Sequence, residues 1–135
     1  MAETELISAK LEDYLSTIFD LMARKRVARV SDIAAAMGVQ MPTVTGVLRH
    51  LAEHGLVNYE PYKFVTLTPQ GTEIARGMIR REDILKKFLT DVLGLPEETA
   101  GRDACGMEHA VSEETLERLT QFVQSMGVAA GKEPL

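Results

Sequence analysis

The chain has few of the residues that cross-link or anchor proteins. Of its 135 residues one is cysteine and none is tryptophan, and aromatic residues make up 5%. A single cysteine cannot form an internal disulfide, so a reducing cytoplasm is the expected compartment. No apolar run approaches the ~20 residues of a membrane span, and the acidic N-terminus has no signal-peptide core. These absences exclude a disulfide scaffold and predict a cytoplasmic protein without a membrane partner.

Charge is distributed unevenly along the chain, whose net charge is −5. Residues 1–81 contain 10 Lys and Arg against 9 Asp and Glu, whereas residues 82–135 contain 5 against 11. Four of the basic residues cluster between Arg24 and Arg29. Such asymmetry favours a DNA-binding part joined to an acidic second part. An uneven but functionless surface charge is the alternative.

The first half of the chain has the pattern of a winged helix. A glycine-containing turn between two short helices is a helix-turn-helix, and the alternating stretch LVNYEPYKFVTLT is typical of a two-stranded hairpin. We expect helices over residues 5–24, from the N-cap Ser31 to Gly38 and from Pro42 to Gly55, and a hairpin turn near Pro61–Lys63.

The second half of the chain predicts helices only. A long helix should run from 69 to 93 and end at Gly94, a short one should carry residues 105–112, and a last one should run from the N-cap Ser112 to Gly127. The expected fold is therefore mainly α, with an N-terminal winged helix-turn-helix domain (1–70) followed by an all-helical domain (71–135). Apolar faces on the long and last helices predict a symmetric dimer through this acidic half.

The short helix carries the stretch CGMEHAVS, in which Cys105, Glu108 and His109 are spaced at i, i+3 and i+4. Because each helical residue advances by about 100°, these three side chains should share one face, opposite the apolar residues around Ala104 and Met107. Thiolate, carboxylate and imidazole together suit Fe(II), Zn(II), Co(II) or Mn(II). The alternative is a core cysteine beside a solvated glutamate and a surface histidine.

Glu82 lies inside the apolar stripe of the long helix, between Met78 and Leu85. A carboxylate turned toward a core is unfavourable unless it is paired, protonated or bound to a cation. Lys86 could be that partner. A metal ion shared with the residues around Cys105 is the other interpretation.

Other chemistry has little support in the sequence. Cys105 and His109 could be a nucleophile and its base, but no third orienting group or oxyanion-hole motif accompanies them. We therefore expect no enzyme and no small organic substrate. Two further hypotheses stay open: a metal-independent winged-helix regulator in which Cys105 is a redox sensor, and a protein-interaction module that makes no DNA contact.

Several stretches together resemble one known family: LEDYLSTIFDL, ARVSDIAAAMGV, PTVTGVLRHLAEHGLV, LTPQG and DACGMEHAVS. The chain is similar to the diphtheria-toxin-repressor family of metal-dependent regulators, and within it to the short manganese-transport-regulator type. The resemblance implies a homodimeric, metal-activated transcriptional repressor that binds double-stranded operator DNA and controls iron or manganese homeostasis. Its implied metal ligands are Asp13, Glu82, Cys105, Glu108 and His109. From its helix pattern alone Asp13 is a solvated residue, and only the resemblance makes it a ligand.

This sequence departs from the family pattern at four positions. Ser16 replaces a carboxylate of the manganese regulators, and Glu82 stands where both subtypes usually have histidine. Lys86 and Gly101 replace an acid and a histidine of the iron repressors' ancillary site, so we expect one metal ion per subunit. The mixed O, N and S set favours Fe(II) before Mn(II), because hard Mn(II) prefers carboxylate to thiolate. Zn(II) or Co(II) could occupy the same ligands in vitro.

The expected DNA contacts fall in the winged helix. Thr43 and Thr45 could equally be ordinary helix-start residues, and Gly46 suggests that DNA shape carries much of the specificity. The base-reading candidates are Gln40, Thr43, Thr45 and Arg49, and the phosphate-contact candidates are Arg29, Tyr62 and Lys63.

Overall fold

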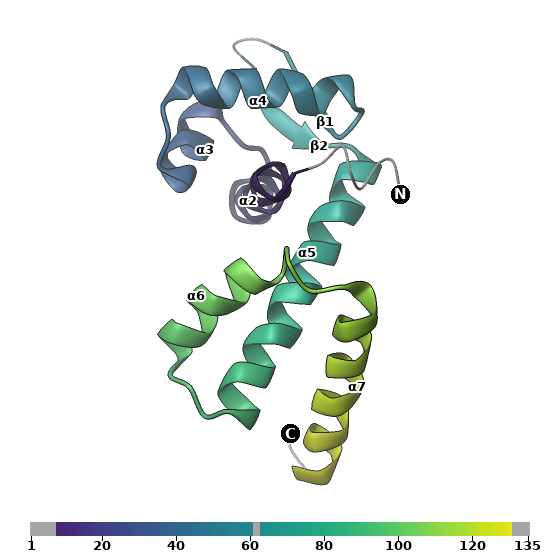
Figure 1. The fold of residues 1–135 in the computed structure, drawn as a ribbon. Coiled ribbons are helices and arrows are strands. Elements are labelled where there is room, and N and C mark those ends of the chain that lie inside the picture. Colours follow the sequence, from purple (N-terminus) through teal and green to yellow (C-terminus); the bar gives the residue numbers. More distant parts are fainter. Residues whose placement is uncertain (1–7, 61–62, 131–135) are drawn as a thin grey trace. The chain divides into compact units, whose positions relative to one another are not determined.

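The computed structural model describes residues 8–60 and 63–130, with side chains up to residue 126. The chain divides into two compact units, Met1–Met78 and Ile79–Leu135, each of which is described by itself. The described part is helical apart from a small two-stranded sheet in the first unit, as Figure 1 shows. The expected mainly α fold is confirmed.

Helix α2 (Ala9–Lys25) begins at Ser8, whose Oγ accepts a hydrogen bond from the backbone N–H of Leu11 at 3.3 Å. It buries a stripe at helical spacing that includes Tyr14, Leu15 and Ile18, all fully buried. This periodicity is why the segment is helical and why it packs along one face. The helix expected over 5–24 is confirmed from Ala9 onward, while residues 5–7 lie outside the described residues.

The helix-turn-helix consists of α3 (Val30–Met37) and α4 (Met41–Glu53), joined by a turn in which Gly38 has a φ of 69°. The predicted N-cap Ser31 is wrong, because the backbone of Arg29 is the N-cap and Ser31 lies in the first turn. The reason is a contact between two residues that are far apart in sequence. Ala28 forms an antiparallel bridge with Val65, so the chain stays extended through Arg29 and the helix starts directly after it.

The wing is an antiparallel hairpin of β1 (Val57–Tyr59) and β2 (Val65–Leu67), which confirms the expected strands. Val57 pairs with Leu67 and Tyr59 with Val65. Of the predicted turn, Pro61 and Tyr62 lie outside the described residues. The core of this unit draws on α2, α3, α4 and both strands, and includes Tyr14, Leu15, Ile18, Ile33, Leu48, Leu51, Leu56, Val57 and Val65.

The second unit contains the end of α5 (Pro69–Lys87), a π-helical segment η1 (Phe88–Val92), α6 (Glu97–Met107) and α7 (Glu113–Ala130). The helix expected to end at Gly94 is confirmed, although its last turn is π-helical rather than α-helical. The core of the second unit is formed by Leu85 and Leu89, which pack against Ala100 and Ala104 of α6. Partly buried leucines of α7 pack against this cluster.

The ends of α6 and α7 locate the candidate motif. Helix α6 ends at Met107, so Glu108 is its C-cap and His109 lies in the following turn. The predicted N-cap Ser112 is confirmed, because its Oγ accepts the N–H of Thr115 at 3.1 Å. The predicted stop at Gly127 is wrong, because α7 continues to Ala130. A glycine inside a helix costs only about 1 kcal/mol, so the helix can continue through it.

Among the described residues no helix combines the length and the apolar character that a membrane span requires.

Candidate functional site

Glu108 and His109 form a buried carboxylate–imidazole pair at the end of α6. Glu108 is 2% exposed, and its Oε2 lies 3.5 Å from Nε2 of His109, whose side chain is 15% exposed. The N–H of Glu108 still donates to the carbonyl of Ala104 at 3.0 Å, which fixes the start of the pair on the helix. A buried carboxylate requires a proton or a positive partner. An oxygen and a nitrogen donor side by side fit a divalent transition metal ion.

Cys105 does not share the environment of Glu108. Its side chain is exposed on α6, whereas the Glu108 side chain is buried. Cys105 and Glu108 therefore differ in burial, and the shared face of the three side chains stays a prediction. Glu108 follows the buried Ala104 by four residues and continues its stripe, whereas Cys105 is rotated away from that stripe by about 100°.

The other two predicted ligands lie on different helices. Glu82 is half-buried on α5 in the second unit, as its place in the apolar stripe predicts. Asp13 is half-buried on α2 in the first unit, next to the fully buried Tyr14. It is therefore less exposed than its helix pattern predicts. The hydroxyl of Ser16 donates to the carbonyl of Glu12 at 2.9 Å and so bonds within its own helix.

Lys86 and Gly101, which replace two ancillary-site residues of the iron repressors, lie close together. A Cβ placed on Gly101 would lie 3.9 Å from Cε of Lys86. A cationic side chain therefore runs past the position where the family pattern has a second histidine. A positive charge there opposes the binding of a second cation.

Arg81 on α5 contacts the turn that carries the pair. Its guanidinium donates to the carbonyls of Glu108 and Val111 and forms an ion pair with Glu113 at 2.8 Å. Sequence reasoning missed Arg81, because these partners follow it by 27 to 32 residues and no local pattern connects them.

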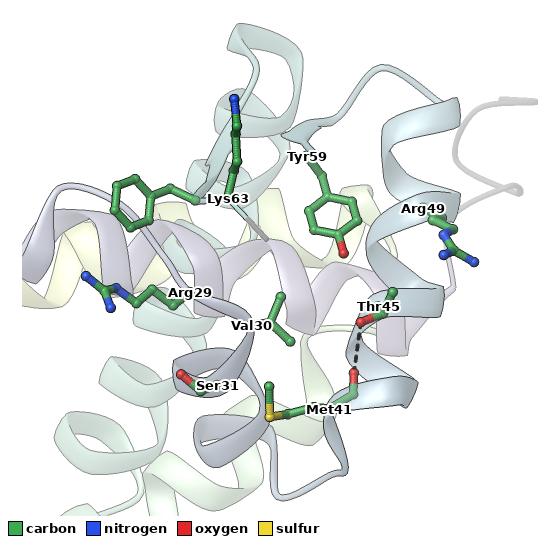
Figure 2. Close-up of a pocket in the computed structure, with 9 residues that line it drawn as sticks. Arg29, Val30, Ser31, Met41, Thr45, Arg49, Tyr59 and Lys63 are labelled. Carbon is green, nitrogen blue, oxygen red and sulfur yellow. Dashed lines mark hydrogen bonds between the residues drawn. The ribbon is translucent and has the colours of Figure 1, made fainter. Parts of the chain in front are cut away.

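A cavity of about 410 Å³ opens on the first unit between the start of α3, helix α4 and the wing (Figure 2). Arg29 and Lys63 lie on one side of it, Arg49 lies across from them, and the ring of Tyr59 projects between. Three cationic side chains from separate elements therefore line this cavity, and helix α4 of the helix-turn-helix forms one wall of it.

The predicted DNA-contact residues differ in how available they are. Gln40, Thr43 and Arg49 are exposed. The Thr45 hydroxyl donates to the carbonyl of Met41 at 3.2 Å, so it also serves its own helix. Lys63 is exposed and forms a 3.2 Å ion pair with Glu60. Tyr62 lies outside the described residues.

The basic cluster at residues 24–29 is partly neutralised. Arg24 pairs with Asp20 at 3.0 Å, and Lys25 pairs with Asp32 at 3.4 Å. Arg29 remains directed to the cavity, where its guanidinium contacts the Phe64 ring.

Phe64 was missed by sequence reasoning, although it is 52% exposed and lines the cavity. Strand alternation could have found it. Val65 and Leu67 point into the core, so a residue of opposite parity such as Thr66 or Phe64 points outward.

A winged helix followed by a helical unit with a buried carboxylate–imidazole pair defines a metal-responsive DNA-binding regulator. Two family descriptions match the chain: "Iron dependent repressor, N-terminal DNA binding domain" over residues 6–65 and "Iron dependent repressor, metal binding and dimerisation domain" over residues 68–130. The chain belongs to the iron-dependent repressor family of metal-dependent transcriptional repressors. The resemblance inferred from the sequence is confirmed.

The chain is similar to several members of this family. It is 42% identical over 120 residues to the transcriptional regulator MntR of Salmonella typhimurium. This match covers 89% of this chain and 76% of that protein. A manganese-dependent transcriptional repressor solved in complex with manganese is 32% identical with a TM-score of 0.76, covering 84% of this chain and 52% of the other. IdeR of T. acidophilum is 27% identical with a TM-score of 0.76, covering 84% of this chain and 53% of the other. This chain therefore spans about half the length of those two solved chains.

Proposed function

We propose that this chain is a repressor whose binding to operator DNA is activated by one divalent metal ion per subunit. The observation that carries the proposal is the buried Glu108 carboxylate 3.5 Å from His109 Nε2, in a chain whose other unit is a winged helix with a basic cavity. The proposal assigns the chain no catalytic activity and no small organic substrate. Because its partner is operator DNA, the protein would act in the cytoplasm.

The proposed ligands are Asp13, Glu82, Cys105, Glu108 and His109. Support differs among them. Glu108 and His109 have the geometry of a donor pair, and Glu82 has a half-buried carboxylate in the same unit. Cys105 lies one helical turn before Glu108 and would supply the soft donor from an exposed position. Asp13 is proposed from the family resemblance.

The proposed ion is Fe(II) first and Mn(II) second. The thiol of Cys105 favours Fe(II), because affinity rises from Mn(II) to Fe(II) and thiolate is a soft ligand. The similarity to a repressor that was solved in complex with manganese supports Mn(II) as the second candidate ion. The cation near Gly101 supports the stoichiometry of one.

The proposed activation is a population shift. When bound, the ion supplies positive charge that offsets the buried and half-buried carboxylates. If only the DNA-competent state holds it tightly, a hundredfold excess over Kd stabilises that state by about 2.7 kcal/mol. Bound DNA must then raise the metal affinity by the same factor, because binding free energies are reciprocal.

On the DNA side, we propose that Arg29, Arg49 and Lys63 take phosphate oxygens or base edges around the cavity. Gln40, Thr43 and Thr45 would contact base edges from the start of α4. Two such heads must reach major grooves about 34–36 Å apart, which requires a dimer. Exposed apolar side chains of the second unit, Leu93 at 56% and Phe122 at 46%, support a homodimer through this unit.

The test is fluorescence anisotropy of labelled candidate operator DNA, under reducing and anaerobic conditions. We expect tight binding with Fe(II) or Mn(II), weak binding with chelator, and loss of the metal response in His109→Ala. Metal-independent binding that responds to oxidation would favour the redox sensor. No DNA binding under any condition would favour the interaction module.

A further inference from the structure

Arg81 makes four hydrogen bonds to one short turn. Its Nε and Nη2 donate to the carbonyl of Glu108 at 3.1 and 2.7 Å, and Nη2 also donates to the carbonyl of Val111 at 2.6 Å. Its Nη1 donates to the carboxylate of Glu113 at 2.8 Å. The Arg81 side chain is only 15% exposed, whereas that of Glu113 is 88% exposed. The three hydrogen bonds to backbone carbonyls are therefore shielded from solvent, whereas the ion pair with Glu113 is exposed.

These contacts fix both ends of the segment that carries His109. Helix α6 ends at Met107 with Glu108 as its C-cap, so the Glu108 carbonyl lacks an intrahelical partner and lies at the negative end of the helix dipole. An arginine from α5 supplies the donors and the positive charge. Inside the turn, the N–H groups of Ala110 and Val111 bond to the Met107 carbonyl at 2.9 and 3.1 Å.

We propose that Arg81 is a positioning residue for the metal site. It acts through the backbone: by holding the carbonyls of Glu108 and Val111, it fixes where the Glu108 carboxylate and the His109 imidazole point. The inference rests on the proposed function, because it assumes that these two residues bind the ion. It goes beyond the ligand set, because Arg81 has no atom that can bind a cation.

A planar guanidinium is required for this role. Its donors diverge in a fixed fork, which lets one side chain reach two carbonyls and a carboxylate at once. A lysine at position 81 keeps the charge but not the fork, so Arg81→Lys should restore the function only in part. Glu113 serves the exposed ion pair, so Glu113→Gln should leave the two carbonyl contacts in place.

The experiment measures the Kd of Mn(II) for the full chain by competition with a fluorescent chelator. Removing groups that orient metal ligands typically costs 10–100-fold in affinity, so Arg81→Ala should raise Kd by about that factor. Arg81→Lys should fall between Arg81→Ala and the parent. Arg80→Ala, an exposed arginine on the same helix, and Glu113→Gln are matched controls that should stay within about twofold.

A second readout needs no metal. In the metal-free protein, amide hydrogen exchange at Ala110 and Val111 should speed up in Arg81→Ala while exchange in the middle of α6 stays slow. A purely structural role would lower the thermal midpoint and leave the Kd of the folded protein unchanged. If Arg81→Ala does not fold, Arg81→Lys is measured alone: a Kd above that of the parent supports the positioning role, and a Kd equal to that of the parent contradicts it.

The two proposals fail in different ways. If His109→Ala weakens Mn(II) binding but Arg81→Ala and Arg81→Lys match the parent, the positioning role is wrong and the metal site stands. If the parent chain binds neither Fe(II) nor Mn(II), the proposed function is wrong, and the positioning role is overturned with it.

Discussion

The guanidinium of Arg29 lies over the face of the Phe64 ring, with Cζ 5.1 Å from the ring centroid. Arg29 is the backbone N-cap of α3, and Phe64 directly precedes β2 of the wing. The contact therefore joins the helix-turn-helix to the wing at the edge of the basic cavity. A ring that orders the guanidinium before DNA arrives lowers the entropy lost on binding.

Phe64→Ala should weaken DNA binding without changing its salt dependence. An exposed cation–π contact is worth about 0.5–1 kcal/mol, which corresponds to a two- to fivefold rise in Kd. No charge is removed, so the slope of log K against log salt should stay that of the parent. Phe64→Tyr is the matched control and should bind normally. Arg29→Ala, by contrast, should lower the slope by about one. Anisotropy titrations across a salt series measure both quantities.

His109→Ala should raise the metal concentration needed for DNA binding by at least the 10–100-fold typical of orienting groups. Cys105→Ser should weaken metal binding too, and it should shift the preference toward Mn(II), because a hydroxyl is harder than a thiolate. Cys105→Ser should leave DNA binding without metal unchanged, whereas His109→Ala also removes a partner of the buried Glu108 and should lower the stability of the metal-free protein. Titrations with Fe(II) and Mn(II) followed on labelled DNA give both results. A normal metal response in His109→Ala would show that the site assignment is wrong.

The parent chain should bind one tightly held divalent ion per subunit, as counted by titration calorimetry. Lys86→Glu combined with Gly101→His should add a second ion, because it removes a cation and supplies two ligands. The position can accept a side chain, since a Cβ at Gly101 meets nothing nearer than 3.9 Å. Two high-affinity ions in the parent would contradict this expectation.

Gly71→Ala should destabilise the first unit by roughly 1–3 kcal/mol, the cost of forced overpacking. A Cβ at Gly71 would overlap the backbone carbonyl of Leu56, which cannot move away because it accepts the N–H of Thr68 at 3.1 Å. Gly46→Ala is the control. It has open space around it inside α4 and should stabilise the helix by up to about 1 kcal/mol. Urea denaturation followed by circular dichroism compares the two variants.

Phe122→Glu should shift a dimer toward monomer at equal protein concentration. Phe122 is 46% exposed on α7 and contacts Phe88 edge-on at 6.3 Å between centroids. A charge placed in an apolar interface must lose its water. Gln124→Glu adds the same charge at an exposed neighbouring position and should change little. Sedimentation velocity distinguishes the two, and a monomeric parent would refute the dimer.

The elements of the fold could be predicted because each rests on a local pattern. The stripe around Tyr14 and Ile18 marks α2, and Gly38 marks the turn before α4. The predictions that were wrong depend on contacts between residues that are far apart in sequence. Ser31 looks like an N-cap, yet the bridge between Ala28 and Val65 sets where α3 begins. The π-helical turn after Lys87 has no single-residue signature of this kind.

The sequence predicted candidate ligands, and the structure adds the environment of each. Spacing singled out Cys105, Glu108 and His109, yet it treated the helix as continuing past Met107. A helical wheel also gives only the angle of each side chain, whereas burial depends on what packs against that part of the helix. The contacts of Arg81 were out of reach for the same reason as the bridge of Ala28, because tertiary packing creates them.

The exposed position of Cys105 has a consequence for how such a protein can diverge. Its side chain is exposed on α6, whereas Ala104 and Glu108 are buried, so the size of the side chain at position 105 is not set by the core. Substitutions at this position should therefore change the free energy of unfolding little, since surface changes usually alter it by less than about 0.5 kcal/mol. If Cys105 is the soft donor, a lineage can exchange one nutrient metal for another by a single codon change, without first acquiring a compensating mutation elsewhere.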